Sequence, residues 1–292
     1  MGKYSIKDLE QLSGIKAHTI RIWEKRYKLI SPERTATNIR FYSDEDLKKI
    51  INVSLLNTHG VKISKIADMS FDEMSKTILE MSDSKSEATI YIDQLIVAMV
   101  DLEEEKFDKI LSDLIERIGF ERSITEVVYP FLEKIGVLWQ TGTITPAHEH
   151  FISNLIRQKL ITSIASLPIA PKKSRKAILF LPEGELHELG LLFFHYLTRK
   201  RGYRTFYLGQ SVPHGDLKKI YSLHKPEIMI TSLISVPVPS QFEKYMNSLS
   251  SDFPEATIFA SGLMLRNTAF IIPKNVKPFY KATELPALLE SL

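Results

Sequence analysis

The spacing of apolar residues changes twice along the 292-residue chain. Over the first 75 residues, short helical stretches are separated by turn residues, and four longer helical stretches follow between about 90 and 165. From about 176 onward, short runs of strand-forming residues alternate with helical stretches. Since helices repeat every 3.6 residues and strands every 2.0, the pattern predicts a multidomain chain, α first and α/β last. The expected domains span 1–75, 76–170 and 171–292.

The first domain is expected to begin with two short helices joined by a glycine turn. Ser5 is a suitable N-cap for the first helix, and Gly14 ends it. The second helix, 17–27, places Ile20 and Trp23 on one side and leaves donor side chains on another. This arrangement is typical of a helix-turn-helix with its recognition helix.

A small β-ribbon and a third helix should follow. Alternation around Phe41 indicates the ribbon, with Asn38 at a turn that tolerates a left-handed conformation. Ser43-Asp-Glu-Asp46 has the composition of a capped, acidic helix start. In this order the parts resemble the MerR-family winged helix-turn-helix over about 70 residues, although that family usually has Gly where this chain has Asn38.

That resemblance implies binding to double-stranded operator DNA. Donors of the second helix would face the major groove, and the ribbon would hold the DNA backbone. The candidate DNA-binding residues are Lys16, His18, Thr19, Arg21, Lys25, Arg34, Arg40 and Tyr42. Because base contacts specify sequence while phosphate contacts position, Arg21 is the best candidate for reading a base. A basic helical hairpin that contacts proteins is the alternative.

Charge and composition narrow the class of protein. Residues 1–43 carry nine Lys/Arg and four Asp/Glu, a net +5, whereas residues 71–118 carry thirteen acids and five bases, a net −8. A basic end suggests a polyanionic partner. The lack of cysteine excludes disulfides, thiolate metal sites and cysteine nucleophiles. No 18-residue apolar run or signal-peptide pattern is found, so we expect a cytoplasmic protein with no membrane partner.

The second domain is expected to be a four-helix bundle. Its helical stretches have short connections and run over 90–102, 107–118, 124–138 and 149–165. Trp139 precedes a polar loop, and Glu149 and His150 open the last helix. Taken alone, these residues are most simply a core Trp and polar groups at a helix start.

The spacing Trp, nine residues, Glu-His resembles the signature of the adenosylcobalamin-binding bundle in light-sensing MerR regulators of the CarH and LitR type. The resemblance implies that Trp139 packs over the cofactor and that Glu149 and His150 meet its adenosyl group. Those photoreceptors commonly have a His directly after the Trp, whereas this chain has Gln140.

The third domain is predicted to be a doubly wound parallel α/β domain, flavodoxin-like in class. Strands are expected at 177–181, 205–208, 227–232 and 257–260, with a fifth near 277–280, and helices at 189–201, 215–224 and 240–249. Polar or small residues should lie just past the strand ends, at Glu185 and His187, Gly209 and Gln210, Ser232 to Ser235, and Ser261 and Gly262. Their convergence predicts a ligand at one sheet edge.

The loop Glu185-Leu-His-Glu-Leu-Gly190 resembles the Glu-x-His-x-x-Gly form of the B12-binding motif. The resemblance implies that His187 ligates cobalt from below. It also implies that the nucleotide tail of the cofactor enters a slot lined by Ser232-Leu233 and Ser261-Gly262. Ser261 stands where Gly is usual, which narrows that slot.

Together the three parts resemble a MerR-family regulator with a C-terminal B12-binding domain. This implies a transcriptional repressor, not an enzyme, that senses adenosylcobalamin and light through a cofactor held between bundle and α/β domain. Sustained heptads are missing after the helix-turn-helix, so assembly into a dimer or tetramer must come from later domains. Two alternatives remain: a regulator of this architecture that acts without cobalamin, and a corrinoid-carrying enzyme module.

Overall fold

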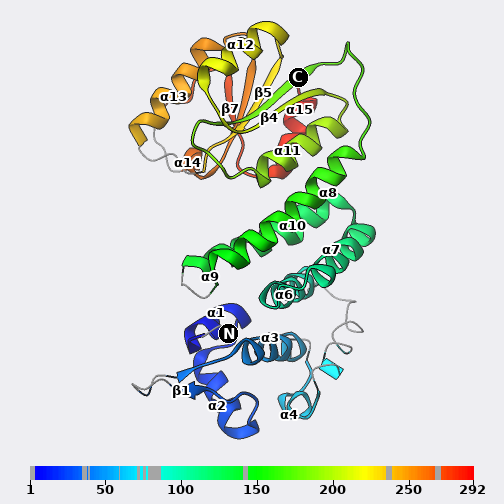
Figure 1. Ribbon diagram of the computed structural model, residues 1–292, viewed down its shortest axis with the longest axis vertical. Helices are drawn as coiled ribbons and strands as arrows, with labels where there is room; N and C mark the ends of the chain where they lie inside the picture. The colour runs from blue at the N-terminus through cyan, green and yellow to red at the C-terminus, as the bar shows by residue number, and fades with distance from the viewer. Residues whose placement is uncertain are drawn as a thin grey trace. The chain divides into compact units, whose positions relative to one another are not determined.

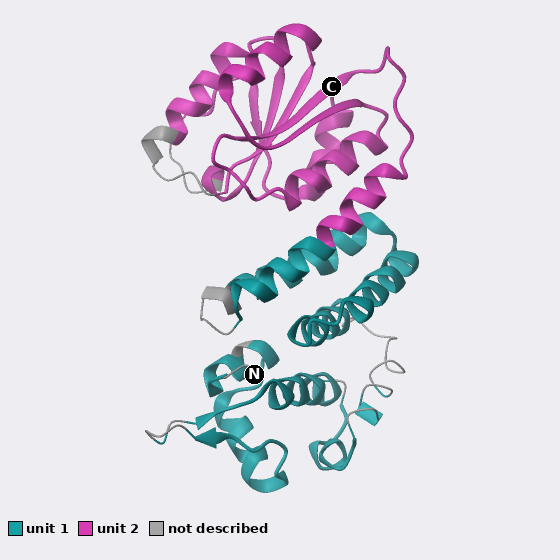
Figure 2. Ribbon diagram, in the orientation of Figure 1, with its two compact units in different colours: residues 1–155 teal, residues 156–292 magenta. Residues whose placement is uncertain are grey.

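The computed structural model describes residues 4–34, 38, 40–58, 60–70, 73–74, 77, 87–140, 144–234, 239–266 and 271–292. The chain forms two compact units, 1–155 and 156–292, which Figure 2 colours separately. Helix α10 (Pro146–Ala165) contributes residues to both units. The finer division at 75 and 170 stays a prediction.

Unit 1 begins with the predicted helix-turn-helix, α1 (Ile6–Ser13) and α2 (Ala17–Tyr27). A capping box starts α1: the Ser5 hydroxyl accepts a hydrogen bond from the Asp8 amide, and the Asp8 carboxylate accepts one from the Ser5 amide. Gly14 ends α1 with φ 73°, a left-handed conformation that glycine adopts without strain. The bounds of α1 therefore follow from local signals.

The wing is a two-stranded antiparallel ribbon. It consists of β1 (Glu33–Arg34) and β2 (Arg40–Phe41), and Asn38 between them has φ 65°, as predicted. An isolated bridge between Tyr4 and Tyr42 joins the ribbon to the start of the chain. Two helices follow, α3 (Asp44–Thr58) and α4 (Ile63–Ala67). The Ser43 hydroxyl accepts a hydrogen bond from the Asp46 amide, which confirms the capped start of α3.

The helical stretches of the second region are also confirmed. They are α6 (Glu87–Val100), α7 (Glu104–Ile118), α8 (Phe120–Arg122), the π-helix η1 (Ser123–Val128), α9 (Tyr129–Gln140) and α10. The π-helical segment is a departure from the simple helix expected there. The rings of Phe107 and Phe131 pack with centroids 5.9 Å apart, and Lys134 pairs with the buried Asp93 at 2.8 Å. These contacts join α7 and α6 to α9.

The winged helix-turn-helix packs against the helices that follow it within unit 1. Helix α3 contacts α6, and α1 contacts α9. Lys48 of α3 is only 9% exposed and forms ion pairs with Asp101, just after α6, and with Glu45. Asn52, one turn further along α3, is also buried. Burial of a lysine in a contact requires an opposite charge, which Asp101 supplies.

Unit 2 contains a five-stranded parallel sheet in the order β4-β3-β5-β6-β7, which is the flavodoxin-like order. The strands are β3 (Lys176–Pro182), β4 (Arg204–Val212), β5 (Ile228–Ser232), β6 (Thr257–Ser261) and β7 (Val276–Pro278). One expectation was wrong: Gly209 and Gln210 lie inside β4, not past its end. Gly209, with φ 77°, sits where the register with β3 shifts, so a bulge lets the strand continue.

Helices cover both faces of the sheet (Figure 1). Helices α12 (His214–His224) and α13 (Pro239–Asp252) share one core with alternate strand residues such as Ile178, Met229 and Ile258. Helix α11 (Leu189–Lys200) packs on β3, β4 and β5, and α15 (Leu285–Glu290) packs on α11. The short α14 (Leu263–Arg266), the 3₁₀ turn η2 (Ala282–Glu284) and α15 were not predicted.

Candidate functional site

The recognition helix α2 presents its polar side chains to solvent. Ile20 and Trp23 are buried and fix the helix, whereas His18, Arg21 and Lys25 are exposed. Within the described residues, these three make no hydrogen bond or ion pair. Thr19 is half-buried beside them. Cationic side chains without partners on one helix face are suited to a phosphate backbone and to base edges.

The other cationic candidates have partners within the winged helix-turn-helix. Lys16 pairs with Glu10 at 3.1 Å, Arg34 donates to the Asn38 side-chain oxygen at 2.6 Å, and Arg40 lies 3.8 Å from Glu24. Lys16, Arg34 and Arg40 are exposed, so each guanidinium or ammonium group still reaches solvent. These surface pairs are weak enough to exchange for a phosphate.

Tyr42 differs from the other DNA-binding candidates because it is fully buried. Its hydroxyl donates to Glu24 at 3.2 Å, and burial together with that carboxylate raises the pKa of Tyr42 to about 12. Tyr42 therefore helps to fix the wing to α2, and a contact from it to DNA stays a prediction. Glu24, which holds both Tyr42 and Arg40, was missed because an acidic residue on a basic helix gives no DNA-binding signal.

The start of α10 brings two of the predicted cofactor contacts together. Glu149 accepts a hydrogen bond from the Ser153 hydroxyl at 2.5 Å, and its other oxygen lies 2.9 Å from Nδ1 of the exposed His150. His148 lies back against Thr145, with Nδ1 2.8 Å from the Thr145 hydroxyl. Trp139 and Gln140 end α9, but their side chains lie outside the described residues.

The loop after β3 is built around one buried carboxylate. Glu185 is 3% exposed, and its Oε1 accepts hydrogen bonds from the amides of Leu186 and His187 at 3.0 Å each. The same oxygen lies 2.6 Å from Nδ1 of His187, and Oε2 accepts a hydrogen bond from the Ile234 amide at 2.8 Å. Glu185 therefore fixes both the backbone and the ring of His187.

This geometry sets the tautomer of the neutral imidazole. Since a carboxylate can only accept, Nδ1 of the neutral His187 ring carries the proton and donates to Glu185, which leaves Nε2 as the nitrogen with a lone pair. The His187 side chain is 59% exposed, so Nε2 reaches solvent. A carboxylate behind an accessible imidazole is the usual arrangement for a metal-ligating histidine. The residues fit a metal bound through Nε2.

Exposed apolar side chains lie at the sheet edge that carries His187. Leu186, Ile234 and Leu263 are exposed although they are large hydrophobic residues, and they follow β3, β5 and β6 at the same sheet edge. Exposed apolar groups gathered at one edge indicate a binding surface. These residues fit a cobalamin: His187 would hold its cobalt, and the apolar side chains would cover part of its surface.

The predicted tail-binding positions lie at the neighbouring strand ends. Ser232 and Ser261 are buried, and the Leu233 amide donates to the Ser261 carbonyl at 2.8 Å. A Cβ atom on Gly262, which has φ 118°, would lie 2.1 Å from the Leu233 carbonyl oxygen, so only glycine fits. Gly190 lies in the first turn of α11, where a Cβ would just touch Phe194.

Further residues hold the His187 loop, and of these only Gln210 was expected at this edge of the sheet. From β4, the Gln210 side chain donates to the Leu186 carbonyl at 2.7 Å, and the Ser211 hydroxyl accepts from the Gly184 amide at 3.1 Å. The buried Glu188 lies 2.5 Å from Arg157 of α10 and accepts a hydrogen bond from Tyr207 at 3.2 Å. The extension of β4 thus packs against the loop, and no sequence motif indicated these contacts.

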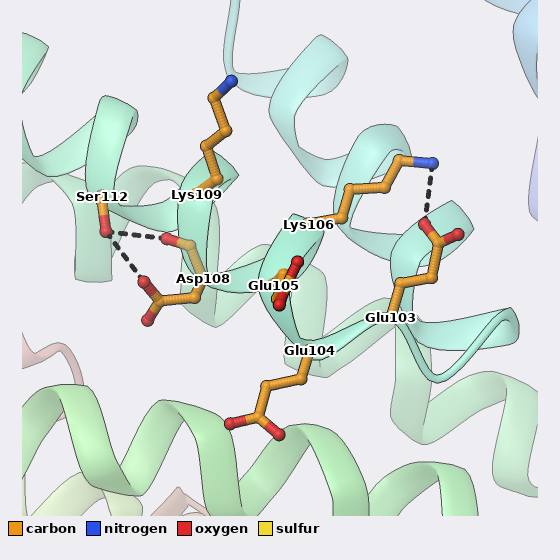
Figure 3. A pocket seen from close by; sticks show the side chains of 7 residues that line it. All are labelled: Glu103, Glu104, Glu105, Lys106, Asp108, Lys109 and Ser112. Atoms are coloured by element: carbon orange, nitrogen blue, oxygen red, sulfur yellow. Dashed lines mark hydrogen bonds and ion pairs between the residues drawn. The ribbon is translucent and has the colours of Figure 1, made fainter.

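A surface hollow elsewhere contains none of these residues. It lies along the start of α7 and is lined by Glu103, Glu104, Glu105, Lys106, Asp108, Lys109 and Ser112. Figure 3 shows Lys106 paired with Glu103 at 3.1 Å and Ser112 bonded to the Asp108 carbonyl at 2.7 Å. In the described ranges no group of three acidic or His side chains forms a metal site, and no helix is long and apolar enough to span a membrane.

Two family models match segments of the chain that precede the parallel sheet. Residues 4–70 match the family described as MerR HTH family regulatory protein, and residues 91–162 match the B12 binding domain. The second match falls on helices α6 to α10. The chain therefore contains a segment that matches a MerR-type helix-turn-helix, followed by a segment that matches a B12 binding domain.

Two similar proteins come from Myxococcus xanthus. The chain is 27% identical over 257 residues to the HTH-type transcriptional repressor CarH, covering 86% of this chain and 85% of CarH. It is also 27% identical over 239 residues to the HTH-type transcriptional repressor CarA, covering 81% of this chain and 78% of CarA.

A solved structure shares the fold. The monomethylamine corrinoid protein of Methanosarcina barkeri matches 70% of this chain and 99% of its own length, with a TM-score of 0.56 and 16% identity. At that identity the likeness concerns the fold alone, and it agrees with a helical region followed by a parallel sheet flanked by helices.

Proposed function

We propose that this protein is a transcriptional repressor that binds operator DNA through α2 and its wing and senses adenosylcobalamin and light. One observation carries the proposal: His187 is an exposed imidazole with its free nitrogen outward and a buried carboxylate behind it, in a chain with a cationic recognition helix. The names of CarH and CarA support the role of repressor.

In this proposal His187 holds the cobalt, and Glu185 holds the ring through Nδ1 so that Nε2 faces away from the carboxylate. Ser232, Leu233, Ser261 and Gly262 line the tail slot, and Gly190 belongs to the same motif. Trp139, Glu149 and His150 meet the adenosyl group. When bound, adenosylcobalamin supplies a cobalt–carbon bond that green light breaks. Glu149 and His150 then lose a contact partner, and the loss of this contact is how the chain would detect light.

Regulation is proposed to work by linkage. If cobalamin favours one conformation or assembly and operator DNA favours the same one, each ligand strengthens the other. Paired recognition helices are needed to fit operator half-sites, so we propose self-association to a dimer or tetramer. Loss of the adenosyl contacts would shift the population toward the form that releases DNA.

The test is an absorbance spectrum of the purified protein, incubated with adenosylcobalamin in the dark, desalted, and measured before and after green light. The expected result is a retained cobalamin spectrum that changes on illumination, with a matching change in gel filtration and in retardation of operator DNA. A colourless protein that still retards operator DNA would instead identify a regulator that acts without cobalamin, which Gln140 and Ser261 favour.

A corrinoid-carrying enzyme module is the second candidate, because the solved structure that shares the fold is a corrinoid protein. The regulator names of the two Myxococcus relatives favour a non-enzymatic role. Methyl transfer from protein-bound methylcobalamin to a thiol acceptor, measured with and without the protein, separates the two. A protein-dependent rate would favour the enzyme module.

A further inference from the structure

A buried carboxylate directly follows the proposed cobalt ligand. Glu188 is 7% exposed, and it stands at the start of α11 without capping that helix through its side chain. Its two carboxylate oxygens contact side chains from two other elements, β4 and α10. Oε2 accepts a hydrogen bond from the Tyr207 hydroxyl of β4 at 3.2 Å, and Oε1 lies 2.5 Å from Nη2 of Arg157 on α10. Helix capping therefore does not explain the burial of this charge.

Arg157 is the charge that compensates Glu188. Within the described residues, the buried Oε1 has no aligned hydrogen-bond donor, so the guanidinium of Arg157 stabilises it as an ion pair. Another titratable group, His195, stacks on the ring of Tyr207 with centroids 5.0 Å apart. Burial lowers the pKa of His195 to about 4, so this imidazole is neutral and adds no positive charge. Without Arg157, a buried carboxylate would lack its counter-charge.

The loop between the two carboxylates contains His187. Glu185 binds the amides of Leu186 and His187 and the ring of His187. Glu188, whose backbone carbonyl accepts from Leu192, is tied to the first turn of α11 and through its side chain to β4 and α10. Glu185 and Glu188 thus hold the loop on either side of His187. Glu185 binds groups of the loop itself, and Glu188 binds side chains from β4 and α10.

We propose that Glu188, clamped by Arg157 and Tyr207, is a positioning residue for His187 that couples the cobalt-ligating loop to helix α10. The inference rests on the proposed role of His187 in cobalamin binding. Arg157 follows His150 by seven residues, about two helical turns, so both project from the same side of α10. A displacement of this helix would therefore reach the loop through the ion pair between Arg157 and the buried Glu188.

The first test uses the protein without cobalamin. Arg157→Met keeps the length of the side chain and removes its charge, and Gln158→Met is a matched control at the next, exposed position of α10. Hydrogen–deuterium exchange of a peptide covering 184–189 is expected to rise at least ten-fold in Arg157→Met and to match the parent protein in Gln158→Met. Unchanged exchange in Arg157→Met overturns the proposal.

The second test titrates the same proteins with hydroxocobalamin and follows absorbance. Arg157→Met should raise the dissociation constant at least ten-fold and move the spectrum of the bound cofactor toward that of His187→Ala. Lower thermal stability with an unchanged dissociation constant and spectrum would mean that the ion pair is structural only, which also overturns the proposal.

A double variant guards against misfolding. Arg157→Met with Glu188→Gln removes both charges and keeps an acceptor for Tyr207, so it should recover the melting temperature. Exchange and hydroxocobalamin affinity should stay altered, and their recovery along with stability would contradict a positioning role. If the parent protein binds no hydroxocobalamin, the proposed function fails, while the exchange measurement still decides whether Glu188 orders the loop.

Discussion

The recognition helix and the His187 loop hold their functional side chains in opposite ways. On α2, Arg21 and Lys25 extend into solvent and make no hydrogen bond or ion pair within the described residues. At the sheet edge, the ring of His187 is fixed by Glu185, which is 3% exposed and binds three further amides. A helix suited to a hydrated polyanion gains from adaptable side chains, whereas a histidine proposed to bind a metal gains from a ring that is oriented before the metal arrives.

The largest effect should come from His187→Ala. Because groups that merely orient a metal ligand change affinity 10–100-fold, loss of the ligand itself should weaken cobalamin retention by more than about 100-fold. Equilibrium titration with hydroxocobalamin measures it. His224→Ala, at the far end of the sheet, is the control, and an equal loss in both variants would reject the ligand assignment.

Glu185→Ala tests the support of that ligand. The substitution leaves three amides and the His187 ring without their acceptor, and we expect unfolding free energy to fall by about 3 kcal/mol. Denaturant unfolding of the cobalamin-free protein gives the value. Glu183→Ala, an exposed carboxylate two residues earlier, should change it little. Similar decreases in unfolding free energy in the two variants would mean that the hydrogen bonds of Glu185 do not stabilise the loop.

On the recognition helix, Arg21→Ala should cost about 1–3 kcal/mol of binding to the operator and much less on random DNA. Since Arg21 makes no hydrogen bond or ion pair within the described residues, stability should not change. Competition binding with both DNAs, together with a thermal melt, measures the two quantities. Equal losses on operator and random DNA would make Arg21 a phosphate contact.

The smallest effect is expected for Lys25→Ala. A lysine that neutralises one phosphate should reduce the slope of log affinity against log salt concentration by about 1, uniformly across DNA sequences. Fluorescence anisotropy at several salt concentrations measures the slope. A loss confined to the operator would instead indicate a base contact.

Much of the fold could be predicted from the sequence because helix ends and turns depend on residues close together in the chain. The Ser5 capping box, the positive φ of Asn38 and the capped start of α3 each depend on residues a few positions apart. The bulge at Gly209 could not be predicted from the sequence, because it depends on the loop that β4 packs against. The short helices α14 and α15 carry too few residues for a periodic pattern.

In the candidate site too, contacts between residues close in sequence could be predicted, and contacts between distant residues could not. His187 and Glu185 lie two residues apart and belong to a recognisable motif, so their contact was predictable. Arg157 and Glu188 are 31 positions apart and meet only after α10 and the sheet have formed. The resemblance to the MerR family implied that Tyr42 holds the DNA backbone from the wing, and only packing reveals its burial against Glu24.

The π-helical segment Ser123–Val128 has a consequence for the tolerance of this chain to insertions and deletions. A π-turn accommodates an extra residue without breaking the helix, and Tyr129 accordingly donates to Ile124, five positions earlier. Deleting one residue here would restore α-helical spacing and keep the residues after it close to their present phase, because the π-turn already absorbs the extra residue. Phe131 and Ile135 would then still face the core. Deleting one residue within α7 would instead rotate everything after it by about 100°. In-frame loss of a single codon between Ser123 and Val128 should therefore be much less damaging than loss of one codon within α7.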